Sequence, residues 1–136
     1  MVIAPRYLLD TSIVIDAIRR RPGPLLQKLS AEKSRLATST VVVYELYYGA
    51  HRHRDPRRAR AQVDDFIQLV GVLDLDIAAA EHAADIRARL AGRGTPIGPY
   101  DLLIAGQARA RGLVVVTANA GEFERVEGLR VEDWTR

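Results

Sequence analysis

Short apolar runs alternate with longer amphipathic segments along this chain, and Gly, Pro and helix-capping residues separate the two kinds. The apolar runs predict strands at 7–9, 35–38, 72–75, 113–117 and 129–131. The amphipathic segments predict helices at 13–20, 25–29, 41–51, 55–70, 77–90 and 100–111, with a short helical turn after 117. This alternation indicates an α/β fold, with a central, mostly parallel sheet of about four or five strands sandwiched by about six or seven helices.

The run Leu113–Thr117 is the strongest strand signal in the chain because it is apolar almost throughout. Such a run belongs in the middle of a sheet that is covered on both faces. The run Tyr7–Leu9 is similar, and it ends at Asp10, the first of several helix-capping residues. We expect these two strands to lie side by side in the centre of the sheet. Because ligands bind at the carboxyl ends of parallel strands, Asp10 and the residues after Thr117 would then share one rim.

Three more acids are expected near this rim. Asp101 begins the helix that precedes strand 113–117, Glu122 follows that strand, and Glu45 lies within an apolar helical segment. Taken singly, Asp10 is also a favoured helix cap and Asp101 a favourable charge at a helix start. Glu45 and Glu122 have solvated surface positions as their alternative. Because several independent strand and helix ends converge, one shared acidic site is the better joint interpretation.

The chemistry of this site follows from its residue types. The chain has no cysteine and only three histidines, so the candidate ligands are carboxylates. Hard oxygen ligands suit Mg²⁺, or alternatively Mn²⁺, better than zinc. Clustered acids repel one another unless a divalent cation neutralises them, and such an ion also activates water and stabilises charge on phosphate. The acids therefore indicate hydrolysis of a phosphodiester in RNA or DNA.

Arginine supplies nearly all of the positive charge. The chain has 20 Lys and Arg residues and a formal net charge of +3, and only Lys28 and Lys33 are lysine. The planar guanidinium suits phosphate, although an arginine-rich genome would give the same composition. The densest basic stretch, 51–60, is interpreted first as a solvated face and alternatively as a phosphate clamp. For the nearby tyrosines we expect core or dimer contacts rather than base stacking: Tyr44, Tyr47 and Tyr48.

Composition also bounds the class of protein. The 136 residues suit one domain, 1–136, with no linker or repeat. The segment Met1–Leu9 is too short and too interrupted for a signal peptide, and no apolar run approaches the length of a membrane helix. The absence of cysteine agrees with a reducing compartment. We therefore expect a cytoplasmic protein without membrane partners.

Four segments, in order, resemble the motifs of PIN-domain VapC toxins from bacterial toxin–antitoxin pairs. The segments are Leu9–Ser12, Glu45–Ala50, Gly98–Ala105 and Val116–Phe123. One such motif alone would be a weak signal, whereas four at these spacings are specific. The stretch Gly94–Trp134 is most similar to the enteric-like VapC proteins, and the resemblance covers nearly the whole chain.

The resemblance implies a PIN domain with a Mg²⁺- or Mn²⁺-dependent endoribonuclease site. By motif match, Asp10, Glu45 and Asp101 correspond to the acidic triad of the family. Many PIN domains carry aspartate where this chain has Asn119, and the enteric-like subgroup has a similar Asn with a Glu three residues later. Glu122 is therefore expected to be the fourth acid for metal binding and catalysis. Four residues are expected to orient these ligands by hydrogen bonding: Thr11, Ser12, Thr117 and Asn119.

The resemblance further implies a biological role. Enteric-like VapC proteins cut initiator tRNA in its anticodon stem-loop. Family members usually form homodimers and are silenced by a VapB antitoxin whose C-terminal segment covers the acidic site. Toxin and antitoxin can also form larger assemblies. One alternative is a catalytically inactive PIN-like module that binds RNA or protein. Another is an acyl-phosphate protein, either a receiver domain or a haloacid-type phosphatase. That class is disfavoured because Ser12 stands where the phosphatase needs a second Asp and no lysine occurs late in the chain.

Overall fold

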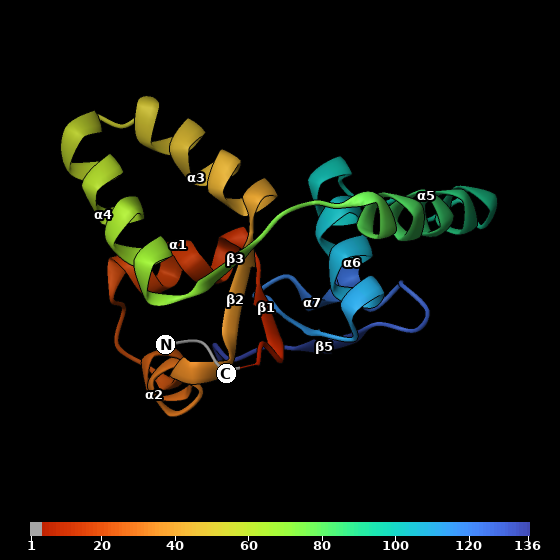
Figure 1. The fold of residues 1–136 in the computed structure, drawn as a ribbon, viewed down its shortest axis with the longest axis horizontal. Coiled ribbons are helices and arrows are strands. Elements are labelled where there is room, and N and C mark those ends of the chain that lie inside the picture. The colour runs from red at the N-terminus through yellow and green to blue at the C-terminus, as the bar shows by residue number, and fades with distance from the viewer. Residues whose placement is uncertain (1–3) are drawn as a thin grey trace.

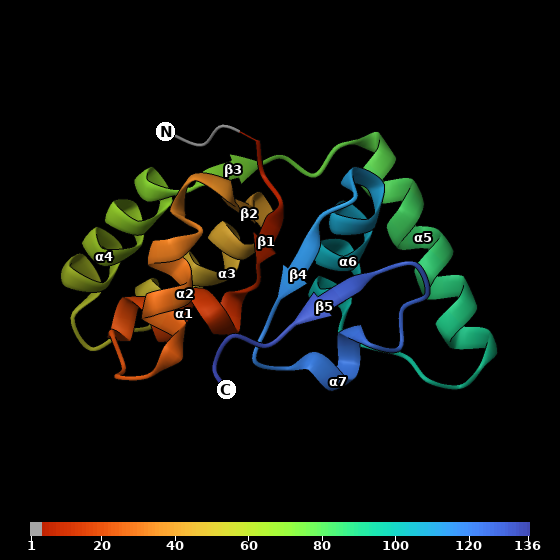
Figure 2. The same ribbon diagram turned by 90° about the horizontal axis from the view of Figure 1, so that it is seen from below.

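A twisted sheet runs through the middle of the molecule, with helices packed on both sides of it (Figures 1 and 2). The computed structural model describes residues 4–136. Residues 1–3 lie outside the described residues, so the expectations for the start of the segment Met1–Leu9 and of the domain 1–136 are not tested there. The strands are β1 Tyr7–Leu9, β2 Leu36–Ser39, β3 Gly71–Leu73, β4 Val114–Val116 and β5 Arg130–Glu132. The helices are α1 Thr11–Arg19, α2 Pro24–Ala31, the short 3₁₀ helix Lys33–Arg35, α3 Thr40–His51, α4 Pro56–Leu69, α5 Ile77–Gly92, α6 Pro99–Arg111 and α7 Ala120–Phe123.

The five strands form one fully parallel sheet in the order β3-β2-β1-β4-β5. This confirms the predicted α/β class, and β1 and β4 are neighbours at its centre, with Leu9 opposite Val116. The predicted strand 72–75 lies instead at Gly71–Leu73, because β3 is an edge strand whose pairing with β2 sets its ends. Apolar pattern alone does not locate such ends, because flanking apolar residues also pack against the core without pairing.

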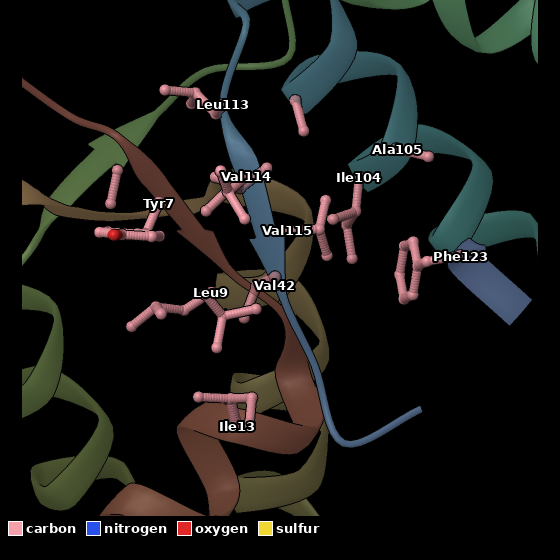
Figure 3. Packing of buried hydrophobic residues seen from close by; sticks show 14 of the residues in the cluster. Tyr7, Leu9, Ile13, Val42, Ile104, Ala105, Leu113, Val114, Val115 and Phe123 are labelled. Carbon is pink, nitrogen blue, oxygen red and sulfur yellow. The ribbon is translucent and has the colours of Figure 1, made fainter. Parts of the chain in front are cut away.

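The central strands are buried on both faces, as their apolar runs predict. Leu9 and Val115 are fully buried, and the surrounding side chains come from α1, α3, α6 and α7 (Figure 3). On the outer side of α6, Gly106 allows a close approach of α5. A Cβ atom at this glycine would lie 2.6 Å from the backbone nitrogen of Ala83 and 2.7 Å from the carbonyl oxygen of Ala79. The absence of a side chain at Gly106 therefore sets the distance between these two helices.

The connections after the central strands bring helix starts to one edge of the sheet. Asp10 follows β1 and caps α1, and Ser39 ends β2 and caps α3. In both views α4 lies at one end of the molecule and α5 at the other (Figures 1 and 2), and Figure 2 shows β1 and β4 between them. Among residues 4–136, none of the helices combines the length and the apolar character needed to cross a membrane.

Candidate active site

Asp10 occupies the end of β1 with both of its carboxylate oxygens held by neighbours. It is 4% exposed. Its Oδ1 accepts hydrogen bonds from Ser12 Oγ at 2.7 Å and from the backbone N–H of Ile13 at 3.1 Å. Its Oδ2 accepts one from Thr117 Oγ1 at 2.5 Å, across the sheet from the end of β4. Burial raises the pKa of Asp10, although these hydrogen bonds work in the opposite direction.

The two hydroxyls on Asp10 are themselves oriented by the backbone. Thr117 Oγ1 accepts the N–H of Asn119 at 2.8 Å, and Ser12 Oγ accepts the N–H of Ala118 at 3.1 Å. A hydroxyl has one proton to donate, so a hydroxyl oxygen that already accepts an N–H directs that proton at its remaining partner. Both protons therefore point at Asp10. This fixes the carboxylate in one orientation at the junction of β1 and β4.

Glu45 reaches the same region from the second turn of α3. Its Oε1 accepts a hydrogen bond from Thr11 Oγ1 at 2.8 Å, which connects the first turn of α1 to α3. The side chain is half-buried rather than fully solvated. The interpretation of Glu45 as a solvated helix position is therefore wrong, because the helix directs this carboxylate toward α1.

Asp101 and Glu122 form a carboxyl pair beside these acids. Asp101 lies in the first turn of α6 and Glu122 in α7. Burial, a hydrogen bond with Glu122, and the charges of Glu122, Asp10 and Glu45 raise the pKa of Asp101 to about 8. The same hydrogen bond lowers the pKa of Glu122. The pair thus holds one proton near neutral pH, since two adjacent carboxylates resist being charged together.

Asn119 supports this pair rather than facing solvent alone. Its Nδ2 donates to Glu122 Oε2 at 3.0 Å, while its backbone N–H holds Thr117. One residue therefore connects the Asp101–Glu122 pair to the hydroxyl on Asp10. Each of the four residues expected to orient the acids makes such a hydrogen bond: Thr11, Ser12, Thr117 and Asn119. Their catalytic roles stay predictions.

The four acids lie near one another, but their carboxylates accept hydrogen bonds from hydroxyl groups or share a proton, and they are not arranged as the ligands of a metal ion. The charges of Asp10, Glu45 and Glu122 all act on Asp101, so each of the three lies within electrostatic reach of Asp101. Nevertheless, in the described range 4–136, no three His, Cys, Asp or Glu side chains are grouped closely enough to hold a metal ion. The donor set fits a hard divalent cation in kind, because every candidate ligand is a carboxylate oxygen. Such a cation would replace the shared proton of the pair.

Two of the tyrosines expected in core or dimer contacts are exposed beside the acids. Tyr44 and Tyr48 are 54% and 55% exposed, so a core position is wrong for both, and a dimer contact stays a prediction. Tyr47 is half-buried and donates to Asp64 of α4 at 2.5 Å. The helical spacing of the apolar residues in α3 could have indicated this exposure. Val42, Leu46 and Ala50 form the buried face of α3, and residues at 44 and 48 fall on another face of the helix. The basic stretch 51–60 is largely exposed, as its interpretation as a solvated face predicts.

One residue missed by the sequence analysis is Thr38 in β2. It is fully buried, and its Oγ1 donates to the carbonyl oxygen of Leu9 at 2.8 Å. This bond secures the backbone of β1 directly before Asp10. A threonine in a predicted strand carries no distinguishing signal, because threonine is common in strands for its shape alone.

Comparisons with known proteins agree with this architecture. The family model for the PIN domain matches residues 7–129, a range that includes all four acids. The chain is 45% identical over 130 residues to the tRNA(fMet)-specific endonuclease VapC of Shigella flexneri, covering 96% of this chain and 98% of the relative. It is 41% identical over 129 residues to Ribonuclease VapC2 of Haemophilus influenzae, covering 95% of this chain and 98% of the relative.

A solved structure extends the likeness to three dimensions. In the crystal structure of DNA-bound VapBC from Salmonella typhimurium, one chain superimposes with a TM-score of 0.92 at 46% identity. The match covers 96% of this chain and 98% of that chain. The described strands and helices therefore have close counterparts in a known fold.

Proposed function

This chain belongs to the PIN domain family, and from that premise we propose that it is a metal-dependent endoribonuclease acting as the toxin of a VapBC-type toxin–antitoxin pair. One observation carries the proposal. Acids from four separate elements converge at the carboxyl edge of the sheet, where Asp10 is held by three donors. A purely structural cap needs only the bond to the backbone N–H of Ile13.

The residues divide the chemical work as follows. Asp10, Glu45, Asp101 and Glu122 would hold Mg²⁺, with Mn²⁺ as the alternative. A bound divalent cation supplies activation of water and stabilisation of charge on the scissile phosphate. Ser12 and Thr117 keep Asp10 in one orientation. The Asp101–Glu122 pair holds a proton between its carboxyls, and loss of that proton leaves two carboxylates available as ligands.

The relatives specify the substrate and partner that we propose. The Shigella flexneri relative is a tRNA(fMet)-specific endonuclease, and this chain shares 45% identity with it over nearly its full length. We therefore assign initiator tRNA, cut in its anticodon stem-loop, as the substrate. The Salmonella typhimurium structure is a VapBC complex, which supports a VapB-type antitoxin as partner. We further propose that the whole chain forms one PIN domain, that two copies form a homodimer, and that the protein acts in the cytoplasm.

Cleavage of purified tRNA tests this function. End-labelled initiator and elongator methionine tRNAs are incubated with the protein in Mg²⁺, in Mn²⁺ and in EDTA. We expect a discrete cut in the anticodon stem-loop of initiator tRNA that needs the cation. Asp10→Asn should abolish the cut. Asp16→Asn is the matched control, because Asp16 lies on α1, the helix that Asp10 caps, and its ion pair within residues 4–136 is with exposed Arg21.

Two outcomes would contradict the proposal. If Asp10→Asn cuts as fast as the unchanged protein, the activity does not come from this site. If the unchanged protein binds tRNA but cuts no RNA with either cation, the chain is a catalytically inactive PIN-like binding module.

A further inference from the structure

Three exposed tyrosines lie on the helices that carry Glu45 and Asp101 and are here called the tyrosine cluster: Tyr44, Tyr48 and Tyr100. Tyr44 and Tyr48 are one turn apart on α3, and Tyr100 lies in the first turn of α6. The hydroxyl oxygens of Tyr44 and Tyr100 are 3.2 Å apart, and the centroids of their rings are 5.5 Å apart. Isolated exposed apolar residues are ordinary, whereas exposed rings grouped across two elements mark a contact surface.

The cluster adjoins the acids directly. Tyr44 precedes Glu45 on α3, and Tyr100 precedes Asp101 on α6. The hydroxyl of Tyr100 is close enough to Glu45 for that charge to act on it, together with its hydrogen-bond partner Tyr44. The rings therefore lie next to the place where a phosphate held by the acids would bind.

On its other side the cluster meets positive charge. Arg52 lies one turn beyond Tyr48, with its guanidinium carbon 5.4 Å from the ring centroid and its Nη1 donating to the tyrosine hydroxyl at 3.1 Å. Further exposed arginines follow at Arg54, Arg57 and Arg58. Within residues 4–136, the ion pairs leave all four of these arginines without a carboxylate partner. From Glu45 to Arg52 the helix rises by about 10 Å, so acids, rings and arginines follow one another along α3.

We propose that the tyrosine cluster stacks an unpaired base next to the scissile phosphate of an RNA strand, while Arg52 and the arginines beyond it bind the adjoining phosphates. This inference rests on the proposed nuclease function and deepens it by defining the substrate as single-stranded at the cut. Unpaired bases stack on aromatic and guanidinium planes, and the backbone is attracted by positive charge.

The arginines beside the cluster favour RNA as the occupant, because the ion pairs of residues 4–136 leave Arg52, Arg54, Arg57 and Arg58 without a carboxylate partner. An RNA strand offers a negative backbone to these arginines and flat bases to the rings. RNA is therefore the occupant that the surface fits.

The test separates stacking from cleavage by measuring both. The probe is an anticodon stem-loop RNA with 2-aminopurine beside the cut, whose fluorescence is quenched when the base stacks. Binding is measured in the inactive Asp10→Asn protein, with Tyr48→Leu and Tyr48→Phe introduced separately. We expect Leu, which removes the aromatic face, to weaken binding by about 10- to 100-fold and to remove the quenching. Phe keeps the face and should stay within about 2-fold.

The same substitutions are then tested in the active protein. Tyr48→Leu should raise KM by a similar factor, whereas Arg130→Gln, a substitution of an exposed arginine on β5, should leave KM unchanged. Equal quenching and affinity in all variants would overturn the proposal, as would equal losses in the Leu and Phe variants.

Light scattering supplies a third outcome. If Tyr48→Leu converts a dimer to a monomer and affinity simply follows, the cluster is a contact between copies and the proposal is wrong. RNA binding that depends on Tyr48 without any cleavage would support stacking while rejecting the nuclease.

Discussion

The carboxyl ends of the parallel strands (the carboxyl edge) and their amino ends (the amino edge) differ in the charge of the side chains around them. At the carboxyl edge, Asp10 is buried and its carboxylate accepts hydrogen bonds from Ser12, from the backbone N–H of Ile13 and from Thr117 at the end of β4. At the amino edge, Arg6, Arg35 and Arg111 surround a hollow of about 470 Å³ and all three are exposed. There the chain is joined by backbone bonds, such as Arg6 N–H to the carbonyl oxygen of Arg35 at 2.9 Å.

The difference separates what the fold needs from what the site needs. Backbone pairing joins the strands at both edges, including the bond at the carboxyl edge from the N–H of Asp10 to the carbonyl oxygen of Val116 at 3.1 Å. At the carboxyl edge, acids of like charge are packed together, which opposes folding until a proton or a cation compensates them. Activity and stability should therefore respond in opposite directions to changes at the acidic edge and respond little at the basic one.

The largest effect is expected from Asp101→Asn. Removing a carboxylate from the cation-binding set should lower kcat/KM by more than about 100-fold, since even partners outside the ligand set are worth 10- to 100-fold. The same change removes one of the crowded acids, so the cation-free protein should melt at a higher temperature at pH 8. Cleavage assays and thermal melts check the two halves. Loss of both activity and stability would mean that Asp101 is mainly a structural residue.

The next largest effect separates a threonine that orients an acid from a threonine that stabilises the fold. Thr117 and Thr38 are both fully buried, but the first donates to Asp10 and the second to the backbone of β1. Thr117→Val should lower activity by about 10- to 100-fold through misorientation of Asp10. Thr38→Val should instead lower the free energy of unfolding by about 1 kcal/mol and change activity less. Activity assays and denaturant unfolding of both variants decide this, and equal effects would remove the distinction.

The pH dependence of stability tests the crowding of acids itself. Because the pKa of Asp101 is raised to about 8 from an ordinary 3.8, the folded chain binds more protons than the unfolded chain between these values. Stability without a cation should thus be greatest at low pH within this window and fall as the pH rises through about 8. The raised pKa of Asp10 acts in the same direction. Thermal melts in EDTA from pH 6 to 9 should fall by a few degrees.

Adding Mg²⁺ at pH 8.5 should restore the lost stability, because the cation binds the folded state. Asp101→Asn should flatten the profile measured in EDTA. A flat profile in the unchanged protein would contradict the shared proton of the Asp101–Glu122 pair.

The smallest effect is expected at the amino edge. Arg111 pairs with Asp76 at 3.5 Å, and both side chains are substantially exposed. Arg111→Gln should change the free energy of unfolding by less than about 1 kcal/mol, since exposed ion pairs contribute little. Cleavage rates should stay within about 2-fold. A large loss of activity would show that the amino edge belongs to the RNA-binding surface and that the two edges do not differ in function.

Much of this arrangement follows from local sequence. The runs ending at Leu9 and Val116 are apolar enough to require the centre of a sheet, and this places Asp10 beside Thr117. The bond between them joins residues 107 positions apart, so its length and partner depend on packing that no local pattern encodes. The proton shared by Asp101 and Glu122 depends on distances for the same reason. A core position for Tyr48 is wrong, and its spacing from the buried Leu46 already indicated another face of the helix, whereas the dimer contact expected as the other possibility stays a prediction.

Cation binding by single variants tests the central claim most directly. Mn²⁺ titrations followed by electron paramagnetic resonance should be made on the unchanged protein, on Asp10→Asn, Glu45→Gln and Asp101→Asn, and on the control Asp16→Asn. If one shared site exists, each of the three site variants should weaken binding by at least about 10-fold, and the control should match the unchanged protein. Undiminished Mn²⁺ affinity in any of the three site variants would contradict the account.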